Sequence, residues 1–267
     1  MTAQNLLVEL FVEELPPKAL KKLGDAFSSV LMGSLERQGL ISTKTPDQFS
    51  AFASPRRLGV WISDVLAEAE DESETVKLMP VSVGWDAERK PTAALLKRLG
   101  AIGVQASDVS KVYPAPDGKA DALYLNRVIP GVDLTTGLQK ALDEAISKLP
   151  IPKVMTYQLA DGWSDVKFVR PAHGLVALHG SSVVPVKALG LTAHNATQGH
   201  RFEAAVSPVV LKDADSYAAT LAKDGAVIAS FAERKAEIAR QLAAAAAKVG
   251  GGCRPIEDDA LLDEVTA

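Results

Sequence analysis

Hydrophobic residues in the first 40 positions form a continuous run and then a helical repeat. Residues 5–12 are rich in Leu and Val and predict a buried strand. Pro16 and Pro17 favour a helix start directly afterwards, because proline is best tolerated in the first helical turn. Apolar residues then recur at spacings of three and four, and Gly39 is well placed to end the helix.

Short strands and helices follow in the rest of the first half. Residues 48–53 and 58–65 predict two strands, joined by the proline-marked connection 54–57. Asp117 and Gly118 signal a further turn. The other predicted elements of this half are a strand at 76–83, a helix at 91–99, a strand at 122–129 and a helix from Asp133 to Leu149 with Asp133 as its cap.

The second half begins with a β-type pattern and ends with helices. Residues 174–178 and 183–189 predict a hairpin around a Gly-Ser-Ser turn. Asp213 begins a predicted helix that reaches Lys223. The last two predicted helices are an alanine-rich one at 231–249, stopped by three glycines, and one at 257–267 that we expect to be cut short.

Strands and helices are intermixed without a regular βαβ alternation. This order predicts an α+β fold with two lobes of mixed elements and antiparallel sheets. The paired prolines Pro150 and Pro152 mark the expected boundary. We therefore expect an N-terminal α+β lobe at 1–150, and at 151–267 a central β-rich block followed by helices.

The composition places the chain among ordinary globular proteins. Of the 267 residues, 47% are hydrophobic and 23% are charged, which excludes global disorder. The single cysteine, Cys253, excludes an internal disulfide framework and a Cys-clustered zinc site, and it favours a reducing compartment. The first ten residues lack a basic segment and predict no signal peptide. We expect a cytoplasmic protein.

The net charge of −4 hides an uneven distribution. Five acids lie within residues 68–74, whereas the window 153–201 carries a charge of +3 and all four histidines. Such a basic, histidine-rich centre can present one face to an anion such as RNA. The alternative is that the acidic run is a solvated loop and the remainder is chance.

Motifs of common catalytic sites are missing from the sequence. It contains no Walker-type phosphate loop, no G-x-G-x-x-G after a strand and no G-x-S-x-G elbow. Cys253 has no histidine near it in sequence, and His173 and His179 lack a third metal ligand. The residues therefore predict a binding or scaffold module with no catalytic residue, no cofactor and no metal of its own.

Four stretches resemble one known family, in the same order along the whole chain. Residues 6–20 are similar to the N-terminal signature of the bacterial glycyl-tRNA synthetase beta subunit, and residues 53–58 resemble its small-x-Pro-Arg-Arg-Leu turn. The central block of that family is similar to residues 168–178 together with 199–202, and residues 261–266 resemble a later segment. The chain departs from the family pattern at Thr156-Tyr157-Gln158 and at Gly174.

The resemblance implies an α2β2 aminoacyl-tRNA synthetase in which the alpha subunit handles glycine, ATP and Mg. It implies that this chain is the N-terminal, non-catalytic portion of the beta subunit, truncated before HD-like and anticodon-binding domains. It also implies a fold similar to the B3/B4-like domain of the phenylalanyl-tRNA synthetase beta subunit. The expected partners are the alpha subunit and tRNA(Gly), with no membrane.

Six cationic side chains are the candidates for contact with tRNA. Paired guanidiniums after a proline suit phosphate oxygens, although each can instead pair with an acid. A structural turn or a buried ion pair is the alternative for the others. The candidates are Arg56, Arg57, Arg170, His173, His200 and Arg201.

Three functions remain open on this evidence. The first is support of α2β2 assembly and of tRNA binding for ATP-dependent glycylation of tRNA. The second is an editing hydrolase, because B3/B4-type folds can host editing, but no activated nucleophile is evident in the sequence. The third is a protein-interaction scaffold that makes no contact with RNA.

Overall fold

The computed structural model describes residues 2–41, 48–118 and 120–267, which form two compact units. The larger unit comprises residues 1–69 and 132–267, and the smaller unit comprises residues 70–131. The predicted division near Pro150 is therefore wrong. The division fails because strands from both sides of Pro150 pair with each other: β9 (Ala172–His179) lies antiparallel to β1 (Ala3–Val12) in one sheet.

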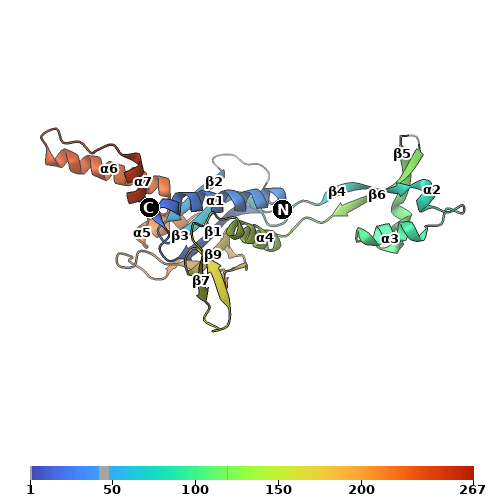
Figure 1. Cartoon of the computed structure of the whole chain (residues 1–267), viewed down its shortest axis with the longest axis horizontal. Coiled ribbons are helices and arrows are strands. Elements are labelled where there is room, and N and C mark those ends of the chain that lie inside the picture. Colours follow the sequence, from blue (N-terminus) through green and yellow to red (C-terminus); the bar gives the residue numbers. More distant parts are fainter. Residues whose placement is uncertain (1, 42–47, 119) are drawn as a thin grey trace. The chain divides into compact units, whose positions relative to one another are not determined.

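A five-stranded antiparallel sheet forms the centre of the larger unit (Figure 1). Its order is β10-β9-β1-β3-β2, so β1 is the middle strand and both of its faces are covered. Antiparallel sheets in a mixed α/β chain confirm the α+β class. The other strands of this sheet are β2 (Phe49–Ser54), β3 (Arg57–Leu66) and β10 (Ser182–Val183).

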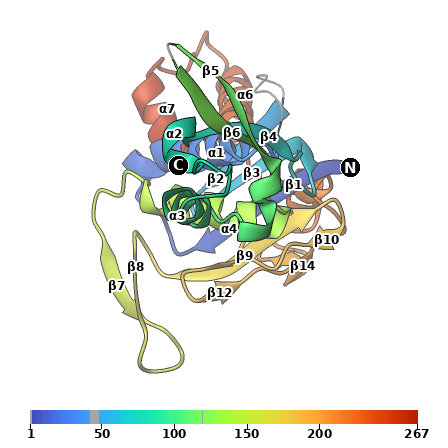
Figure 2. The same ribbon diagram turned by 90° about the vertical axis from the view of Figure 1, so that its right-hand side faces the viewer.

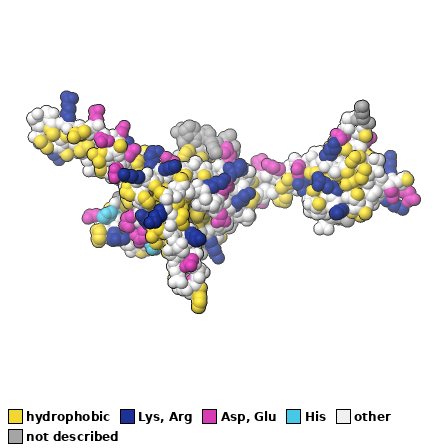
Figure 3. Space-filling view, in the orientation of Figure 1, with side chains coloured by type: hydrophobic (Ala, Val, Ile, Leu, Met, Phe, Trp, Pro, Cys, Tyr) yellow, Lys and Arg dark blue, Asp and Glu magenta, His cyan; other side chains and the backbone are white. Residues whose placement is uncertain are grey.

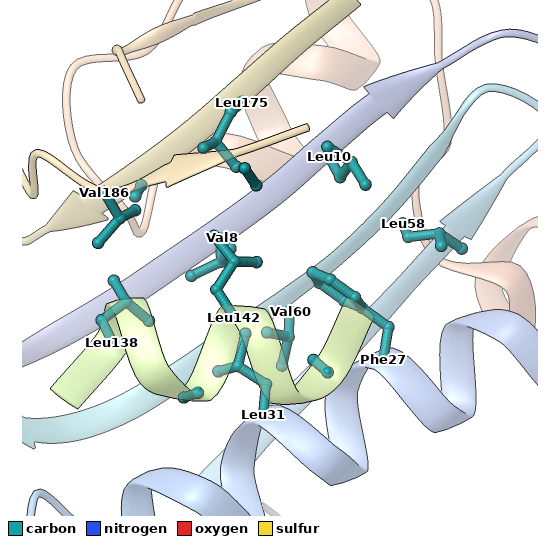
Figure 4. Packing of buried hydrophobic residues seen from close by; sticks show 14 of the residues in the cluster. Val8, Leu10, Phe27, Leu31, Leu58, Val60, Leu138, Leu142, Leu175 and Val186 are labelled. Atoms are coloured by element: carbon teal, nitrogen blue, oxygen red, sulfur yellow. The ribbon is translucent and has the colours of Figure 1, made fainter. Parts of the chain in front are cut away.

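Two helices cover one face of this sheet. Helix α1 (Pro17–Arg37) packs beside α4 (Leu134–Ser147). Phe27 and Leu31 of α1 belong to the same buried cluster as Val8 of β1 (Figure 4). Asp133 caps α4 as predicted, because its carboxylate accepts a hydrogen bond from the backbone N–H of Thr136. Burial of these aliphatic faces is the main stabilising contribution to the unit.

The opposite face of the sheet is covered by later parts of the chain. Leu7 of β1 and Leu178 of β9 point to this side and pack against α5 (Tyr217–Lys223). The rings of Phe52 and Tyr217 lie 4.9 Å apart between centroids. Consequently the odd-numbered positions of β1, including Glu9 and Phe11, face this second layer.

The remaining elements of the larger unit lie around this core. Helices α6 (Phe231–Val249) and α7 (Asp259–Thr266) contact each other, and the hairpin of β7 and β8 extends away from the sheet (Figure 2). The short strands are β7 (Met155–Gln158), β8 (Asp165–Phe168), β11 (Lys187–Ala188), β12 (Leu191–Thr192), β13 (Ala196–Thr197) and β14 (Val209–Val210).

The smaller unit has its own sheet and its own core. Its strand order is β4-β6-β5, and Leu95 and Leu99 of α3 pack on Leu123 and Leu125 of β6. Its elements are β4 (Glu72–Pro80), α2 (Val81–Gly84), α3 (Ala93–Ala101), the 3-10 helix η2 (Ala106–Lys111), β5 (Val112–Asp117) and β6 (Ala120–Ile129).

One predicted strand is much shorter in the structure. The sequence predicts a hairpin strand at 183–189, but β10 ends at Val183 and β11 pairs with β12 instead. Pro185 lies between them, and proline cannot donate a backbone hydrogen bond to a ladder. The pairing therefore stops and the chain turns away from the sheet.

Candidate nucleic-acid interface

A buried carboxylate organises the second face of the sheet. Glu9 is fully buried on β1, where it lies opposite Gly59 of β3. Its oxygens accept hydrogen bonds from Tyr217, Thr197 and Arg57, the last at 3.2 Å from Nε. A buried charge is tolerated only when it is paired and hydrogen-bonded, as here. We call Glu9, Arg57, Thr197 and Tyr217 the Glu9 cluster.

Tyr217 serves this cluster as a neutral donor. Burial raises the pKa of the Tyr217 phenol well above its usual value, and the negative charge of Glu9 raises it further. The hydroxyl therefore stays protonated and donates to the carboxylate.

Arg57, one of the six candidates, lies inside this cluster. It is 3% exposed, and its remaining N–H groups donate to Ser54 Oγ and to the backbone carbonyl of Gln198. The guanidinium thus ties the turn before β3 to the segment that leads into residues 199–202. Its position suits it to hold these two segments together rather than to meet a solvent-borne ligand.

Arg56 projects on the outer side of the same turn. Its guanidinium carbon lies 4.8 Å from the centroid of the Phe11 ring, and the guanidinium carbon of Arg57 lies 5.4 Å from that centroid. Nη2 of Arg56 lies 3.3 Å from Glu13 Oε1, and the Arg56 side chain is 22% exposed. Arg56 therefore reaches the surface, but it already has an acidic partner there.

The adjacent acids Glu13 and Glu14 contact two further candidate residues beside Arg56. Glu13 Oε1 lies 2.9 Å from His173 Nε2, and Arg201 Nη2 lies 3.9 Å from oxygens of both Glu13 and Glu14. A hydrogen bond from its own backbone N–H, together with the charges of Arg56 and Arg201, lowers the pKa of Glu14. The two carboxylates thus bring together basic side chains from three separate parts of the chain.

Arg170 is attached to the same corner by backbone contacts. Its Nε donates to the carbonyl of Glu14 at 2.9 Å, and its Nη1 donates to the carbonyl of Val169 at 2.9 Å. Within residues 2–41, 48–118 and 120–267, Arg170 does not form the buried ion pair that the sequence left open for it. Its bonds fix the chain next to Glu14.

Residues 199–202 form a tight turn that presents Arg201. His200 Nδ1 accepts hydrogen bonds from the backbone N–H groups of Phe202 and Glu203, at 3.3 and 3.1 Å. Gly199 must be glycine, because an added Cβ would lie 2.6 Å from backbone atoms of Gly225. The turn leaves the Arg201 side chain 57% exposed and Phe202 82% exposed.

These segments border a cavity of about 420 Å³, which we call the arginine cavity. Its lining includes Arg56, Arg57, Arg201 and Arg234, and among the described residues Glu14 is the one acidic side chain that lines it. On the face of the larger unit that Figure 3 shows, basic and acidic side chains are intermingled. The cavity is thus a local concentration of positive groups on a protein whose net charge is negative.

Arg234 of α6 is a site residue that the sequence analysis missed. Its N–H groups donate to the backbone carbonyls of Ala53, Thr266 and Ile228 at 2.8–2.9 Å. Burial, and then the charge of Arg57, lower its pKa to about 10, so it remains cationic at neutral pH. In sequence it is one more charge on an amphipathic helix, and no local signal distinguishes it.

Other kinds of site find no support in the described part of the chain. Residues 2–41, 48–118 and 120–267 contain no cluster of His, Cys, Asp and Glu suited to a metal ion. Within the same ranges, no helix has both the length and the apolar character needed to cross a bilayer.

Comparison with known proteins assigns the chain to a family. A model of the family described as "Glycyl-tRNA synthetase beta subunit" matches residues 6–267. The chain therefore belongs to the glycyl-tRNA synthetase beta-subunit family, which confirms the resemblance found in the sequence.

Its relatives carry the name glycine–tRNA ligase beta subunit. The chain is 66% identical over 276 residues to that of Polaromonas naphthalenivorans and 65% identical over 268 residues to that of Delftia acidovorans. The protein of Thiobacillus denitrificans is 61% identical over 267 residues. Each comparison covers 100% of this chain but 38% of the relative, so the chain spans about two fifths of the length of these relatives.

Proposed function

We propose that this chain is the N-terminal, non-catalytic portion of a glycine–tRNA ligase beta subunit. In this role it supports α2β2 assembly and holds tRNA(Gly) for ATP-dependent glycylation, with glycine, ATP and Mg handled by the alpha subunit. It acts in the cytoplasm and binds no cofactor itself. The similarity to beta subunits along the whole chain carries this proposal.

The contact with tRNA is assigned to the rim of the arginine cavity. Arg201 is the strongest candidate, because its side chain is 57% exposed and its nearest carboxylate oxygens lie 3.9 Å away. Such a loose ion pair at the surface contributes little free energy, so Arg201 can readily exchange its carboxylate partner for a phosphate. Arg56 also lines this cavity, and His173 lies near it because both side chains contact Glu13. Arg57 and Arg170 act by positioning the backbone that carries these residues.

The fold proposed for this region is similar to the B3/B4-like domain of phenylalanyl-tRNA synthetase. That likeness raises the editing alternative, which needs an activated nucleophile or water. The hydroxyls of Thr197 and Tyr217 are buried and donate to Glu9, so neither is free to attack a substrate. We therefore favour binding over hydrolysis.

The proposal is tested in the full-length beta subunit purified together with the alpha subunit. Arg201→Glu and Arg56→Glu should weaken tRNA binding while glycine-dependent pyrophosphate exchange, which reports glycine activation, stays unchanged. Lys140→Glu is the matched control, because Lys140 is an exposed cation on α4. Wild-type tRNA affinity in folded variants would contradict contact with RNA and would leave assembly as the role of this region. Failure of the beta subunit to co-purify with the alpha subunit would contradict the role in assembly.

A further inference from the structure

The arginine cavity has a shape and chemistry that the rim contacts alone do not explain. It is a concavity of about 420 Å³, within the range that encloses small ligands. Double-stranded RNA is bound across its broad minor groove and its backbone, which does not require a pocket. A concave site is suited to a group that leaves the duplex.

The lining of this cavity includes a guanidinium that has no acidic partner among the described residues. Among the described residues, Arg234 forms no ion pair, and its hydrogen bonds go to carbonyl oxygens of Ala53, Ile228, Ser230 and Thr266. Arg57 reinforces the positive potential there. Partly buried positive charge that no carboxylate neutralises is stabilised when an anion enters.

An exposed aromatic ring also lines the cavity. Phe202 lines the cavity and is 82% exposed, directly after Arg201. An exposed ring beside guanidiniums is the arrangement that binds unpaired bases, since every base has a face that can stack. The His200 ring lies 6.2 Å from the Phe202 ring, which extends this aromatic surface.

We infer that the arginine cavity receives one unpaired nucleotide of an RNA, with its phosphate toward Arg201 and Arg234 and its base against Phe202. The inference rests on the proposed function, because it assumes that RNA approaches the rim of the cavity. It adds that the RNA must present a single-stranded nucleotide, and it assigns Phe202 and Arg234 to the binding site.

The test measures binding of two RNA probes to the full-length subunit. The probes are a fluorescein-labelled single-stranded pentanucleotide and a blunt-ended duplex that contains the same sequence. Phe202→Ala should weaken pentanucleotide binding by about tenfold, the loss expected for one stacked base, and leave duplex binding unchanged. Phe202→Tyr should restore binding, and Trp163→Ala should not alter it, because Trp163 is an equally exposed aromatic, 91% accessible, in the β7–β8 turn.

The outcomes separate this inference from the proposed function. If Arg201→Glu weakens tRNA binding while Phe202→Ala leaves the pentanucleotide unaffected, the proposed function stands and the inference is wrong. If neither variant changes binding, both are wrong. Competition by adenosine monophosphate as strong as that by the pentanucleotide would also contradict the inference, because it would indicate a mononucleotide site.

Discussion

At the scale of single residues, burial separates the arginines that hold the fold from those that can meet a ligand. Arg57 is 3% exposed and paired with Glu9, whereas Arg201 is 57% exposed and only loosely paired. Arg57 stands in the motif Pro-Arg-Arg-Leu and Arg201 in Gly-His-Arg-Phe, and neither motif indicates whether its arginine is buried. The difference arises because Arg57 lies on the covered face of β3 and Arg201 lies in a surface turn.

Removing the Glu9 carboxylate should destabilise the chain severely. Glu9→Ala leaves the buried Arg57 without its counter-ion and should cost roughly 3–5 kcal/mol in the free energy of unfolding. Urea unfolding followed by circular dichroism measures this loss. The partly exposed Glu13, changed to Ala, should cost about 1 kcal/mol or less. Equal losses in the two variants would mean that the Glu9 cluster does not stabilise the fold.

The sequence predicted this site in part. The motifs drew attention to Arg56, Arg57, Arg170, His173, His200 and Arg201. The structure brings the three segments that carry these residues to the corner beside Glu13 and Glu14. The burial of Arg57 depends on the register in which β1 pairs with β3, and the position of Arg234 depends on how α6 meets the sheet. Neither can be read from local spacing.

At the scale of elements, close packing of α1 on β2 constrains one position. A Cβ on Gly24 would lie 2.6 Å from the Cβ of Ala53, so Gly24→Ala should destabilise by about 1–3 kcal/mol despite the better helix propensity of alanine. Gly100→Ala in α3 is the matched control, because it meets no atom within 4 Å. Thermal unfolding should show a lower Tm for the first variant alone, and an unchanged Tm for Gly24→Ala would contradict this packing.

The contact between α1 and α4 should depend on pH. A hydrogen bond from Lys148, then one from Ser34 and the charge of Arg37, lower the pKa of Glu144 to about 2. A lowered carboxyl pKa contributes stability above the unfolded-state pKa of about 4.3, and this contribution disappears as the pH falls toward 2.

The comparison of wild type with Glu144→Gln isolates this contribution. The wild type should resist urea better than the variant at pH 7, and the difference should shrink between about pH 5 and pH 2. A difference that is constant over this range would show that the ionised carboxylate is not its cause.

Element types were predicted well where periodicity was long. The helix at 231–249 has the predicted bounds, and the strand at 5–12 lies within β1. β5 was missed because it contains Pro114 and Pro116, and it tolerates them because it is an edge strand. β7 and β8 were missed because they are four residues each and mostly exposed, so no apolar pattern marks them.

At the scale of the whole molecule, the smaller unit is an insertion into the larger one. Both ends of the insertion meet in the larger unit, since the N–H of Ala69 donates to the carbonyl of Val132 at 2.9 Å. The sequence analysis did not find this boundary. Pro130 and Gly131 mark its second end, but no such signal stands at its first end, and the pairing of β4 with β6 that closes the insertion joins strands far apart in the sequence.

Removal of the insertion should leave the larger unit folded. Replacing residues 70–131 by a short Gly-Ser linker closes a gap that is already bridged by a backbone hydrogen bond, so loop closure costs little. The shortened chain should retain a cooperative thermal transition and a far-ultraviolet spectrum of mixed helix and sheet. A non-cooperative transition would mean that the larger unit depends on the insertion.

The most direct test of RNA contact is the salt dependence of tRNA binding to the full-length enzyme, for the wild type and for Arg201→Gln. If Arg201 meets a phosphate, the slope of log K against log salt should fall by about one unit in the variant, for every tRNA sequence alike. Glycine activation should stay at the wild-type level. An unchanged slope in a folded Arg201→Gln enzyme would contradict the assignment of this surface to tRNA.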